Sequence, residues 1–445
     1  MSDKTNTENK MDKIISLCKR RGFIFPGSEI YGGLSGFWDY GHYGIFLKNN
    51  IRDLWWKKFV KSRPDIYGVD AAIVMNQKVW KATGHVDGFS DPLSECMICN
   101  HRFRTDQVPL NTLGQAKACP DCGGKLRSPK QFNMLFKTSV GAMEEENSIS
   151  YLRPETAQGM FVNYKNIIDA FHPKLPFGMA QIGKAFRNEI APRDFTFRAR
   201  EFEQMEIEYL VNPKNWEESF ENLRKETISF AEEVGIKKEN IHELEVSESD
   251  RAFYSKRTID FEYDFPFGRK ELYGLAYRTD YDLKKHSEAS GVSLEYLDEE
   301  TKEKFIPHCI EPSFGLDRII LAVLSDAYTE DEMNGETRIF LKFNPKVAPV
   351  KIAVFPLLKN KPELVNKAKE IYQNLAKEFG DVEFDDNGNI GKRYRRQDEI
   401  GTPYCVTVDF DSLEKGDVTV RDRDTGKQER VKISELTQYF KKKFE

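Results

Sequence analysis

Hydrophobic and polar residues alternate along two consecutive segments of the chain and predict two strands with a shared polar face. The first alternation covers residues 181–189, and a second covers residues 197–208 after an interruption at Pro192. The shared face holds Gln181, Gly183, Ala185, Arg187, Glu189, Arg198, Arg200, Phe202, Gln204, Glu206 and Glu208. A solvated surface is the usual reason for a charged strand face. Here an aromatic ring lies among guanidinium groups and carboxylates, so the hairpin is predicted to bind a nucleotide and an amino acid.

A second segment, residues 311–318 with the sequence EPSFGLDR, predicts a strand that leads into a helix. Glu311 and Ser313 are two residues apart and therefore share one strand face, and Gly315 permits the turn into the helix. Residues 319–324 are apolar nearly all round, so this helix is predicted to be buried. Arg318 lies in its first turn, and an arginine on so fixed a scaffold suits a polyphosphate.

The N-terminal part predicts two helices and a strand. Residues 1–10 are polar and predicted to be disordered, and an apolar stripe predicts a helix over residues 11–22. Residues 44–60 then predict a longer helix, and residues 65–76 a strand. The apolar positions of the longer helix are Ile45, Leu47, Ile51, Leu54, Trp55 and Phe59. Taken alone, this helix could be an ordinary core helix.

The middle of the chain predicts two further helices. One opens at LRPETAQG (residues 152–159) with Pro154 in its first turn, and its apolar side continues to Phe171. Glu155 would then stabilise the helix dipole unless it contacts a substrate. An amphipathic helix follows over residues 214–234. Strands alternate from about residue 235 to 310, and a charged, helix-prone stretch near residues 283–305 indicates a solvated insertion without chemistry.

From about residue 348 the pattern becomes strand, helix, strand, which predicts a small α/β unit with parallel pairing. Pro362 begins its helix and Gly380 ends it, and further strands are predicted near residues 382, 404 and 417. Around Tyr394 lies a basic cluster of Lys392, Arg393, Arg395 and Arg396. Such a cluster is either a solvated face or a site where the aromatic ring stacks on an unpaired RNA base.

Composition describes an ordinary globular protein of two to four domains. The 445 residues are 39% hydrophobic, and the net charge of −5 neither indicates a nucleic-acid binder nor excludes a local basic groove. The sequence has no apolar run of membrane-spanning length and no signal-peptide core in its first residues, so no membrane association and a cytoplasmic location are expected.

Four of the seven cysteines have the spacing of a zinc site. Cys96-x2-Cys99 and Cys119-x2-Cys122 are separated by 19 residues, which suits two knuckles that bring four thiolates tetrahedrally around Zn²⁺. With four protein ligands, this zinc would be structural. The alternatives are unligated thiols or a degenerate knuckle. The isolated Cys18, Cys309 and Cys405 fit a reducing compartment.

Longer stretches of the chain resemble one enzyme family. FRNE at 186–189 with RAREFEQME at 198–206 resembles motif 2 of the class II aminoacyl-tRNA synthetases, and EPSFGLDR resembles motif 3 in its glycyl-tRNA synthetase form. Similar stretches are residues 23–41, 152–159 and 271–283. His42 and Tyr43 depart from the family pattern, which affects only the geometry of a loop.

The resemblance implies an α+β/α/β multidomain fold. A class II catalytic domain, built on an antiparallel sheet flanked by helices, would occupy residues 1–347, with a Cys-rich insertion at about 91–130 and a helical and strand insertion at about 212–305. An α/β anticodon-binding domain would occupy residues 348–445. The family forms homodimers through the motif 1 helix and strand, which here match residues 44–76.

The implied reaction is the ATP-dependent attachment of glycine to tRNA(Gly) through glycyl-adenylate. Because the attacking carboxylate is already an anion, the enzyme needs alignment and charge neutralisation more than a general base. The implied catalytic residues are Arg187 and Arg318. The implied ATP-binding residues are Arg187, Asn188, Glu189, Phe197, Arg198, Phe202, Glu271, Leu272, Gly315 and Arg318.

Within this ATP site, Arg187 is assigned to the α-phosphate and the glycine carboxylate, and Arg198 and Arg318 to the outer phosphates. Phe202 and Arg318 would sandwich the adenine, with Glu189 and the backbone near Phe197 reading the base. Mg²⁺ would accompany the ATP and be held by Glu271 or Glu311.

Glycine selection is assigned to carboxylates around the substrate ammonium, in a pocket too tight for a methyl group. The implied glycine-binding residues are Arg104, Glu155, Phe202, Glu203, Gln204, Met205, Glu206, Arg278, Glu311 and Ser313. Because several carboxylates meet, at least one is expected to be paired or neutral, with Arg278 balancing the charge. An unbroken strand would point Glu271 and Arg278 to opposite faces, so a bend is expected near Gly274.

Two alternatives remain. One is another class II synthetase with the same C-terminal domain, for proline or threonine, against which the run from Glu311 to Ser313 and the ETAQG segment argue. The other is a non-catalytic, nucleic-acid-binding relative. Against it argues the presence of four site residues, Arg187, Glu206, Glu311 and Arg318.

Overall fold

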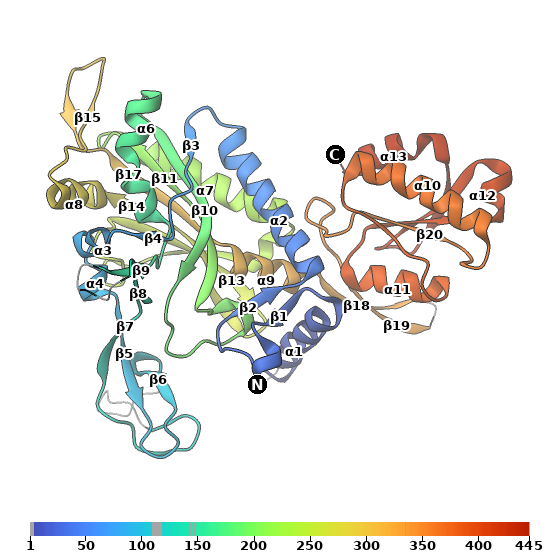
Figure 1. Cartoon of the computed structure of the whole chain (residues 1–445), viewed down its shortest axis with the longest axis horizontal. Helices are drawn as coiled ribbons and strands as arrows, with labels where there is room; N and C mark the ends of the chain where they lie inside the picture. Colours follow the sequence, from blue (N-terminus) through green and yellow to red (C-terminus); the bar gives the residue numbers. More distant parts are fainter. Residues whose placement is uncertain (1–3, 109–117, 143–144, 146–147, 334, 445) are drawn as a thin grey trace.

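The computed structural model describes residues 4–108, 118–142, 145, 148–333 and 335–444. A large body holds the N-terminal and central parts of the chain, and a smaller one holds the elements from β20 onward (Figure 1). A module with strands β5, β6 and β7 projects from the large body (Figure 1). No helix among the described residues is long and apolar enough to span a bilayer.

The largest sheet in the described part of the chain has the order β12-β13-β14-β17-β11-β10-β3. Its strands are β3 (Ile66–Gly68), β10 (Phe177–Phe186), β11 (Glu201–Val211), β12 (Ile241–Glu245), β13 (Arg257–Phe265), β14 (Gly268–Thr279) and β17 (His308–Gly315). Neighbours pair antiparallel, except β10 and β3, which pair parallel. The predicted hairpin is therefore β10 and β11, and the strand of the second segment, β17, lies directly beside it.

The register confirms the predicted polar face over the paired part of the hairpin. Gln181 lies opposite Glu206, and Ala185 opposite Phe202, so these side chains share one face. β11 begins only at Glu201, however, so the extension of the strand back to residue 197 is wrong. Asp194 and Phe195 have φ of 58° and 57°, and this left-handed turn leads into a short 3₁₀ helix instead.

A β-bulge settles the predicted conflict between Glu271 and Arg278. Glu271 pairs with Glu262 and Tyr273 with Phe261, so Leu272 is an extra residue in β14. The extra residue reverses the alternation and brings Glu271 to the face that carries Gly274. The expected irregularity exists, but it lies at Leu272 and again at Arg278 rather than at Gly274.

Three helices cover the opposite face of the sheet: α2 (His42–Trp56), α7 (Trp216–Glu233) and α9 (Leu316–Ala327). Phe314 of β17 packs against Trp55, Phe59 and Phe230, with ring centroids 5.6 to 6.0 Å apart. α9 is buried along most of its length, as predicted. The arginine in its first turn is thereby fixed relative to β17.

Several predicted helix details are wrong. Helix α1 spans Lys4–Arg21, so residues 4–10 are helical, and only residues 1–3 of the predicted disordered segment lie outside the described residues. Ile45, placed on the apolar side of α2, is 39% exposed. The helix predicted from Pro154 is two short helices, α5 (Ala157–Phe161) and α6 (Tyr164–Phe171), and Pro154 and Glu155 precede both.

The remaining described elements complete the large body. They are β1 (Ile24–Pro26), β2 (Trp38–Tyr40), β4 (Val74–Met75), α3 (Gln77–Ala82), α4 (His85–Gly88), β5 (Ser90–Glu95), β6 (Arg102–Arg104), β7 (Lys130–Asn133), β8 (Lys137–Ser139), β9 (Ile149–Leu152), α8 (Tyr281–Ser290), β15 (Tyr296–Leu297), β16 (Lys304–Phe305), β18 (Tyr328–Met333) and β19 (Glu336–Leu341).

The smaller body is an α/β unit with strand order β21-β20-β22-β23-β24 and its own apolar core. Its elements are β20 (Ile352–Pro356), α10 (Pro362–Phe379), β21 (Val382–Phe384), α11 (Ile390–Ile400), β22 (Tyr404–Val408), α12 (Phe410–Lys415), β23 (Asp417–Asp422), β24 (Gln428–Lys432) and α13 (Leu436–Phe444). β20 pairs parallel with β21 and β22, which confirms the predicted parallel pairing, and α10 has its predicted bounds.

In the basic cluster near Tyr394, Lys392 is exposed and Arg395 and Arg396 are partly exposed, whereas Arg393 and Tyr394 make internal contacts. Arg393 is 1% exposed and donates to the carbonyls of Pro356, Asp386 and Gly388. The Tyr394 ring packs against Phe355, and its hydroxyl bonds the Thr407 hydroxyl at 2.6 Å. Both side chains are therefore committed to internal contacts.

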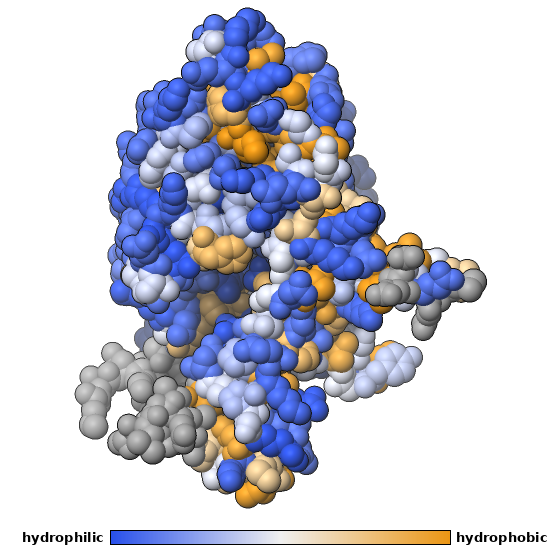
Figure 2. Space-filling view, turned by 90° about the vertical axis from the view of Figure 1, so that its left-hand side faces the viewer, coloured by the Kyte–Doolittle hydropathy of each residue, from blue (hydrophilic) through white to orange (hydrophobic). Residues whose placement is uncertain are grey.

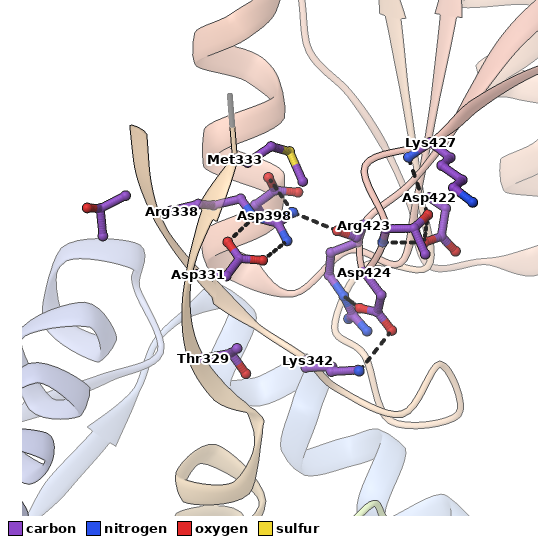
Figure 3. A network of polar contacts seen from close by, with 12 residues as sticks. Thr329, Asp331, Met333, Arg338, Lys342, Asp398, Asp422, Arg423, Asp424 and Lys427 are labelled. Atoms are coloured by element: carbon purple, nitrogen blue, oxygen red, sulfur yellow. Dashed lines mark hydrogen bonds and ion pairs between the residues drawn. The ribbon is translucent and has the colours of Figure 1, made fainter. Parts of the chain in front are cut away.

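A polar network joins the two bodies (Figure 3). Buried Arg338 of β19 donates to both carboxylate oxygens of Asp331, at 2.9 and 2.6 Å, and to the carbonyl of Arg423, at 2.6 Å. It also lies 3.5 Å from Asp398 of α11, which forms a two-point pair with Arg421. The β18–β19 hairpin is thus tied to two elements of the smaller body.

Candidate active site

A cleft of about 310 Å³ opens on the polar face of the large sheet. Its lining comes from β6, from the end of the hairpin, from β14 and from the β17–α9 junction. The predicted site residues that line it are Arg104, Arg187, Glu189, Phe197, Arg198, Phe202, Glu203, Gln204, Glu271, Leu272, Ser313, Gly315 and Arg318. The structure therefore gathers most of the predicted ATP-binding residues around one cavity.

Arg187 lies where the cleft meets the hairpin. Its Nε donates to the carbonyl of Pro154 at 3.0 Å, and its guanidinium lies 5.4 Å from the ring centres of both Phe89 and Phe202. Two aromatic neighbours and one backbone acceptor fix the guanidinium while leaving its remaining N–H groups free to donate. The site thus holds a rigid cation suited to a phosphate or carboxylate.

Arg318 occupies the opposite wall. Its guanidinium lies over the ring of Phe197 at 4.5 Å and forms an ion pair with Glu271 at 3.1 Å. The predicted sandwich pairs Arg318 with Phe202, whereas here Arg318 stacks on Phe197. Because Glu271 is about half exposed, this contact is weak and available for exchange with a ligand.

The remaining cations of the cleft have acidic partners. Arg198 lies 3.9 Å from Glu189, and Arg104 pairs with Asp91 and Asp106 at 2.8 Å each. Burial lowers the pKa of Arg198, so the side chain would gain from a further anion. Asn188 donates its backbone N–H to Met134, and the cleft lining does not include it.

Four glutamates meet beside the cleft, on β11, on β17 and before α5. Glu206 is the most extensively bonded, accepting from Gln204 Nε2 at 2.7 Å, from the Ser313 hydroxyl at 2.6 Å and from Thr156. Oxygens of Glu206, Glu208 and Glu311 lie within 4.8 Å of one another, and all three residues are buried. So much negative charge in a buried space favours either a cation or bound protons.

The glutamates differ in how their charge is balanced. Burial alone would raise the pKa of Glu155, but His85 Nε2 at 3.4 Å and the charge of Arg278 outweigh it and hold this pKa well below its usual range. Burial raises the pKa of Glu311 to about 8, although Arg278, 2.7 Å away, opposes the rise. The expected pairing with Arg278 is therefore present, and the raised pKa makes Glu311 a group that can take up a proton.

Sequence patterns missed the residues that surround Arg278. Asp282 of α8 bonds its guanidinium at two points of 2.9 Å each, and Gln158 links Asp282 to Glu155. Buried His286 contacts Gln158 at 2.8 Å. The stretch described as a solvated insertion without chemistry therefore begins with a helix whose buried side chains support the site. Leu283 and His286 are three positions apart, which places them on one face of a helix. This spacing is a weak sequence signal that the face is buried.

Glu208 was also missed as a site residue. Its side chain is 0% exposed, one oxygen accepts from the Cys309 thiol at 2.9 Å, and the other has no partner among the described residues. Burial and then the charge of Glu311 raise its pKa well above the usual value. Glu208 thus adds a proton-binding group behind Glu206 and Glu311.

Three predicted site residues point away from the cleft. Glu203 binds Lys48 at 2.6 Å and Arg52 at 3.1 Å on α2, behind the sheet. Met205 and Leu272 are 0% exposed in the hydrophobic core. Their side chains face away because neighbouring strand residues point to opposite sides of a sheet, although Glu203 and Leu272 still contribute to the cleft lining.

The projecting module brings the four predicted zinc ligands together. The sulfur atoms of Cys96 and Cys122 are 3.4 Å apart, those of Cys99 and Cys119 are 3.6 Å apart, and all four lie within 4.8 Å of one another. Tetrahedral Zn²⁺ with Zn–S bonds of about 2.3 Å sets sulfur atoms about 3.8 Å apart. The donor set and its spacing fit a structural zinc ion.

Comparisons with known proteins agree with this geometry. Residues 136–327 match the tRNA synthetase class II core domain (G, H, P, S and T), and residues 351–443 match the anticodon binding domain. The glycine--tRNA ligase of Clostridium acetobutylicum is 51% identical, with 98% of this chain and 99% of that protein covered. Those of Clostridium tetani and Acetivibrio thermocellus are each 50% identical, with at least 98% of both chains covered.

Proposed function

The chain belongs to the glycine--tRNA ligase family, and on that premise we propose that the cleft and the adjoining glutamates form glycyl-adenylate from glycine and ATP. The chain is a ligase that attaches glycine to tRNA, with the class II core and the anticodon-binding domain. This agrees with the fold class and the function expected from the sequence. The relatives named above are glycine--tRNA ligases, which favours this function over the two alternatives.

The first step joins glycine to AMP. A carboxylate oxygen of glycine attacks the α-phosphorus of ATP, the bond from this phosphorus to the oxygen bridging the β-phosphorus breaks, and pyrophosphate leaves. In the second step a ribose hydroxyl of the terminal adenosine of tRNA attacks the glycyl carbonyl, loses its proton, and AMP leaves. Both steps need alignment and charge neutralisation more than proton transfer by the enzyme.

Arg187 is proposed to hold the α-phosphate and the glycine carboxylate, because its guanidinium is fixed at the meeting point of cleft and hairpin. Arg198 and Arg318 are proposed to neutralise the outer phosphates from the opposite wall. Glu271 fits a role in holding Mg²⁺, which would supply further charge neutralisation. Glu311 does not fit that role, because it is buried and paired with Arg278.

The glutamates and Ser313 are proposed to bind the glycine ammonium. Glu206 and Ser313 are opposite each other on β11 and β17, and the Ser313 hydroxyl bonds Glu206 at 2.6 Å. This direct link between the two sequence motifs is the observation that carries the proposal. A side chain on the substrate would have to displace closely packed buried groups, at a cost of about 1–3 kcal/mol, which favours glycine.

The remaining expectations are proposals as well. Partly exposed apolar residues on the motif 1 segments, namely Ile45, Ile73 and Val74, support a homodimer through residues 44–76. The four cysteines support structural zinc. The division near residue 347, and a cytoplasmic location, stay predictions from the sequence.

The test is glycine-dependent exchange of pyrophosphate into ATP, with alanine and serine as control substrates. Arg187→Ala should lower the exchange rate by about 10²–10³-fold, because a preorganised group facing developing charge contributes that much. The variant should keep the size of the wild-type protein in solution. Arg193→Ala, a nearby arginine whose side chain is 51% exposed, is the matched control. Unchanged exchange in Arg187→Ala would sink the assignment.

A further inference from the structure

A group of three aromatic side chains lies beside the proposed glycine site. Phe253 and Tyr254 belong to the loop between β12 and β13, and Tyr281 begins α8. The Phe253 ring packs edge-on against Tyr254 at 5.3 Å and against Tyr281 at 5.2 Å. Tyr254 and Tyr281 lie 5.9 Å apart. We call these three residues the aromatic platform.

The aromatic platform touches the site through Tyr254. The Arg278 guanidinium lies 4.3 Å from the Tyr254 ring centre and is itself bonded to Glu311. The outer member, Phe253, is 79% exposed. The Phe253 ring is therefore outside the core, and it connects to the site through Tyr254, which contacts Arg278.

The loop is fixed by backbone bonds on both sides of Phe253. Val246 donates to the Thr258 carbonyl at 2.9 Å, and Lys256 donates to the Tyr277 carbonyl at 2.9 Å. The face of the molecule drawn in Figure 2 is mainly hydrophilic, with separate hydrophobic patches. Exposed Lys256 follows Tyr254 by two residues and exposed Lys284 follows Tyr281 by three, so both add positive charge close to the platform.

We propose that the aromatic platform stacks an unpaired base at the 3′ end of the tRNA as this end enters the glycine site. The proposal rests on the proposed function, whose second step requires that the terminal adenosine reach the glycyl carbonyl. Unpaired bases stack on exposed aromatic rings, and nearby lysines suit the phosphates. The single-stranded 3′ end of a tRNA would account for three features together: the exposed ring, the positive charge beside it, and the contact between the platform and the glycine site.

The experiment measures two reactions for Phe253→Ala, Phe253→Leu and Phe253→Trp. Pyrophosphate exchange, which needs only glycine and ATP, should stay within about twofold of wild type. Charging of tRNA(Gly) should fall about tenfold in kcat/KM for tRNA in the Ala and Leu variants, consistent with the stacking of one base. The Trp variant should restore charging. Phe171→Ala, an exposed phenylalanine (57%) on α6, is the control for loss of an exposed ring.

A direct readout uses a tRNA acceptor minihelix with 2-aminopurine as its terminal base. Wild-type protein should quench the fluorescence on binding, and Phe253→Ala should quench it less. Equal charging by wild type and Phe253→Ala overturns the proposal, and so does a fall in exchange that parallels the fall in charging. Equal charging of tRNA(Gly) by Phe253→Leu and Phe253→Trp also overturns it, since a leucine side chain cannot stack on a base. If wild type itself lacks glycine-dependent exchange, the proposed function fails instead.

Discussion

At the scale of single residues, the direction of a side chain separates the predicted site residues that face the cleft from those that do not. Arg187, Phe202 and Glu206 lie on the cleft side, as the alternation predicts. Glu203 and Met205, in the same stretch, face the helices behind the sheet. Family motifs are read as continuous runs of sequence, whereas a strand offers only every second side chain to a ligand.

Glu311 gives a prediction about pH. Burial raises its pKa to about 8 beside Glu155, Glu206, Glu208 and Arg278, so we expect Glu311 to hold a proton in the free protein at neutral pH. The glycine ammonium favours the ionised carboxylate, so binding must release that proton. The KM for glycine should therefore fall as pH rises from about 6.5 to 8, by at most about tenfold per pH unit, and then level off.

Pyrophosphate exchange at varied glycine concentration and pH measures this dependence. Glu311→Gln cannot lose a proton, so its KM should be higher and nearly independent of pH over the same range. A wild-type KM that rises with pH, or an unchanged slope in Glu311→Gln, would contradict the assignment of the proton to Glu311.

At the scale of elements, periodicity predicted the helices and strands that bury one clear face. Helices α9 and α10 agree with their patterns because apolar positions, proline and glycine mark them consistently. The helix expected from Pro154 divides into α5 and α6, although the apolar residues of both pack into one cluster, so the apolar pattern alone did not show the break. The bulge at Leu272 arises from strand pairing, which a single strand sequence does not specify.

The projecting module gives a prediction about zinc. Purified protein should contain about one Zn²⁺ per chain, and Cys122→Ser should lose it, because structural zinc needs all four thiolates and contributes about 10–16 kcal/mol to folding in small zinc modules. Metal analysis and limited proteolysis of the module measure this. Exchange should persist in the variant, since the zinc has no open coordination position.

Asp121→Ala, which changes an exposed neighbour of Cys122, should keep its zinc and serves as the control. Wild-type protein without zinc, with four titratable thiols in the native state, would favour the alternative of unligated cysteines.

At the scale of the whole molecule, the network around Arg338 holds the two bodies together. The Arg338 side chain is 1% exposed and contacts Asp331, Asp398 and the carbonyl of Arg423 (Figure 3). Arg21 and Tyr43 of the large body also bond Glu399 and Glu383 of the smaller one. The position of the anticodon-binding domain relative to the cleft is therefore set by buried charge pairs.

Arg338→Ala should destabilise the protein by about 3–5 kcal/mol, because it leaves buried Asp398 with one partner fewer and removes the link to Asp331. It should weaken tRNA charging, which uses both bodies, more than pyrophosphate exchange, which uses one. Thermal unfolding and the two assays measure these effects. Arg395→Ala removes a more exposed pair with Glu336 and should change little. Equal losses of exchange and charging in Arg338→Ala would contradict a positioning role.

The sequence by itself determined the hairpin, the buried helix with Arg318, the cysteine pairs, and the family whose motifs these segments carry. These features rest on local alternation, on spacing, or on long runs of matching residues. Tertiary structure alone decided which side chains contact one another in the site. Ser313 bonds Glu206, Asp282 bonds Arg278, His85 lies near Glu155, and the Tyr254 ring packs against Arg278. Such contacts depend on strand order and packing between distant segments, and so do the charge states of buried glutamates, because burial and neighbouring charge set a pKa.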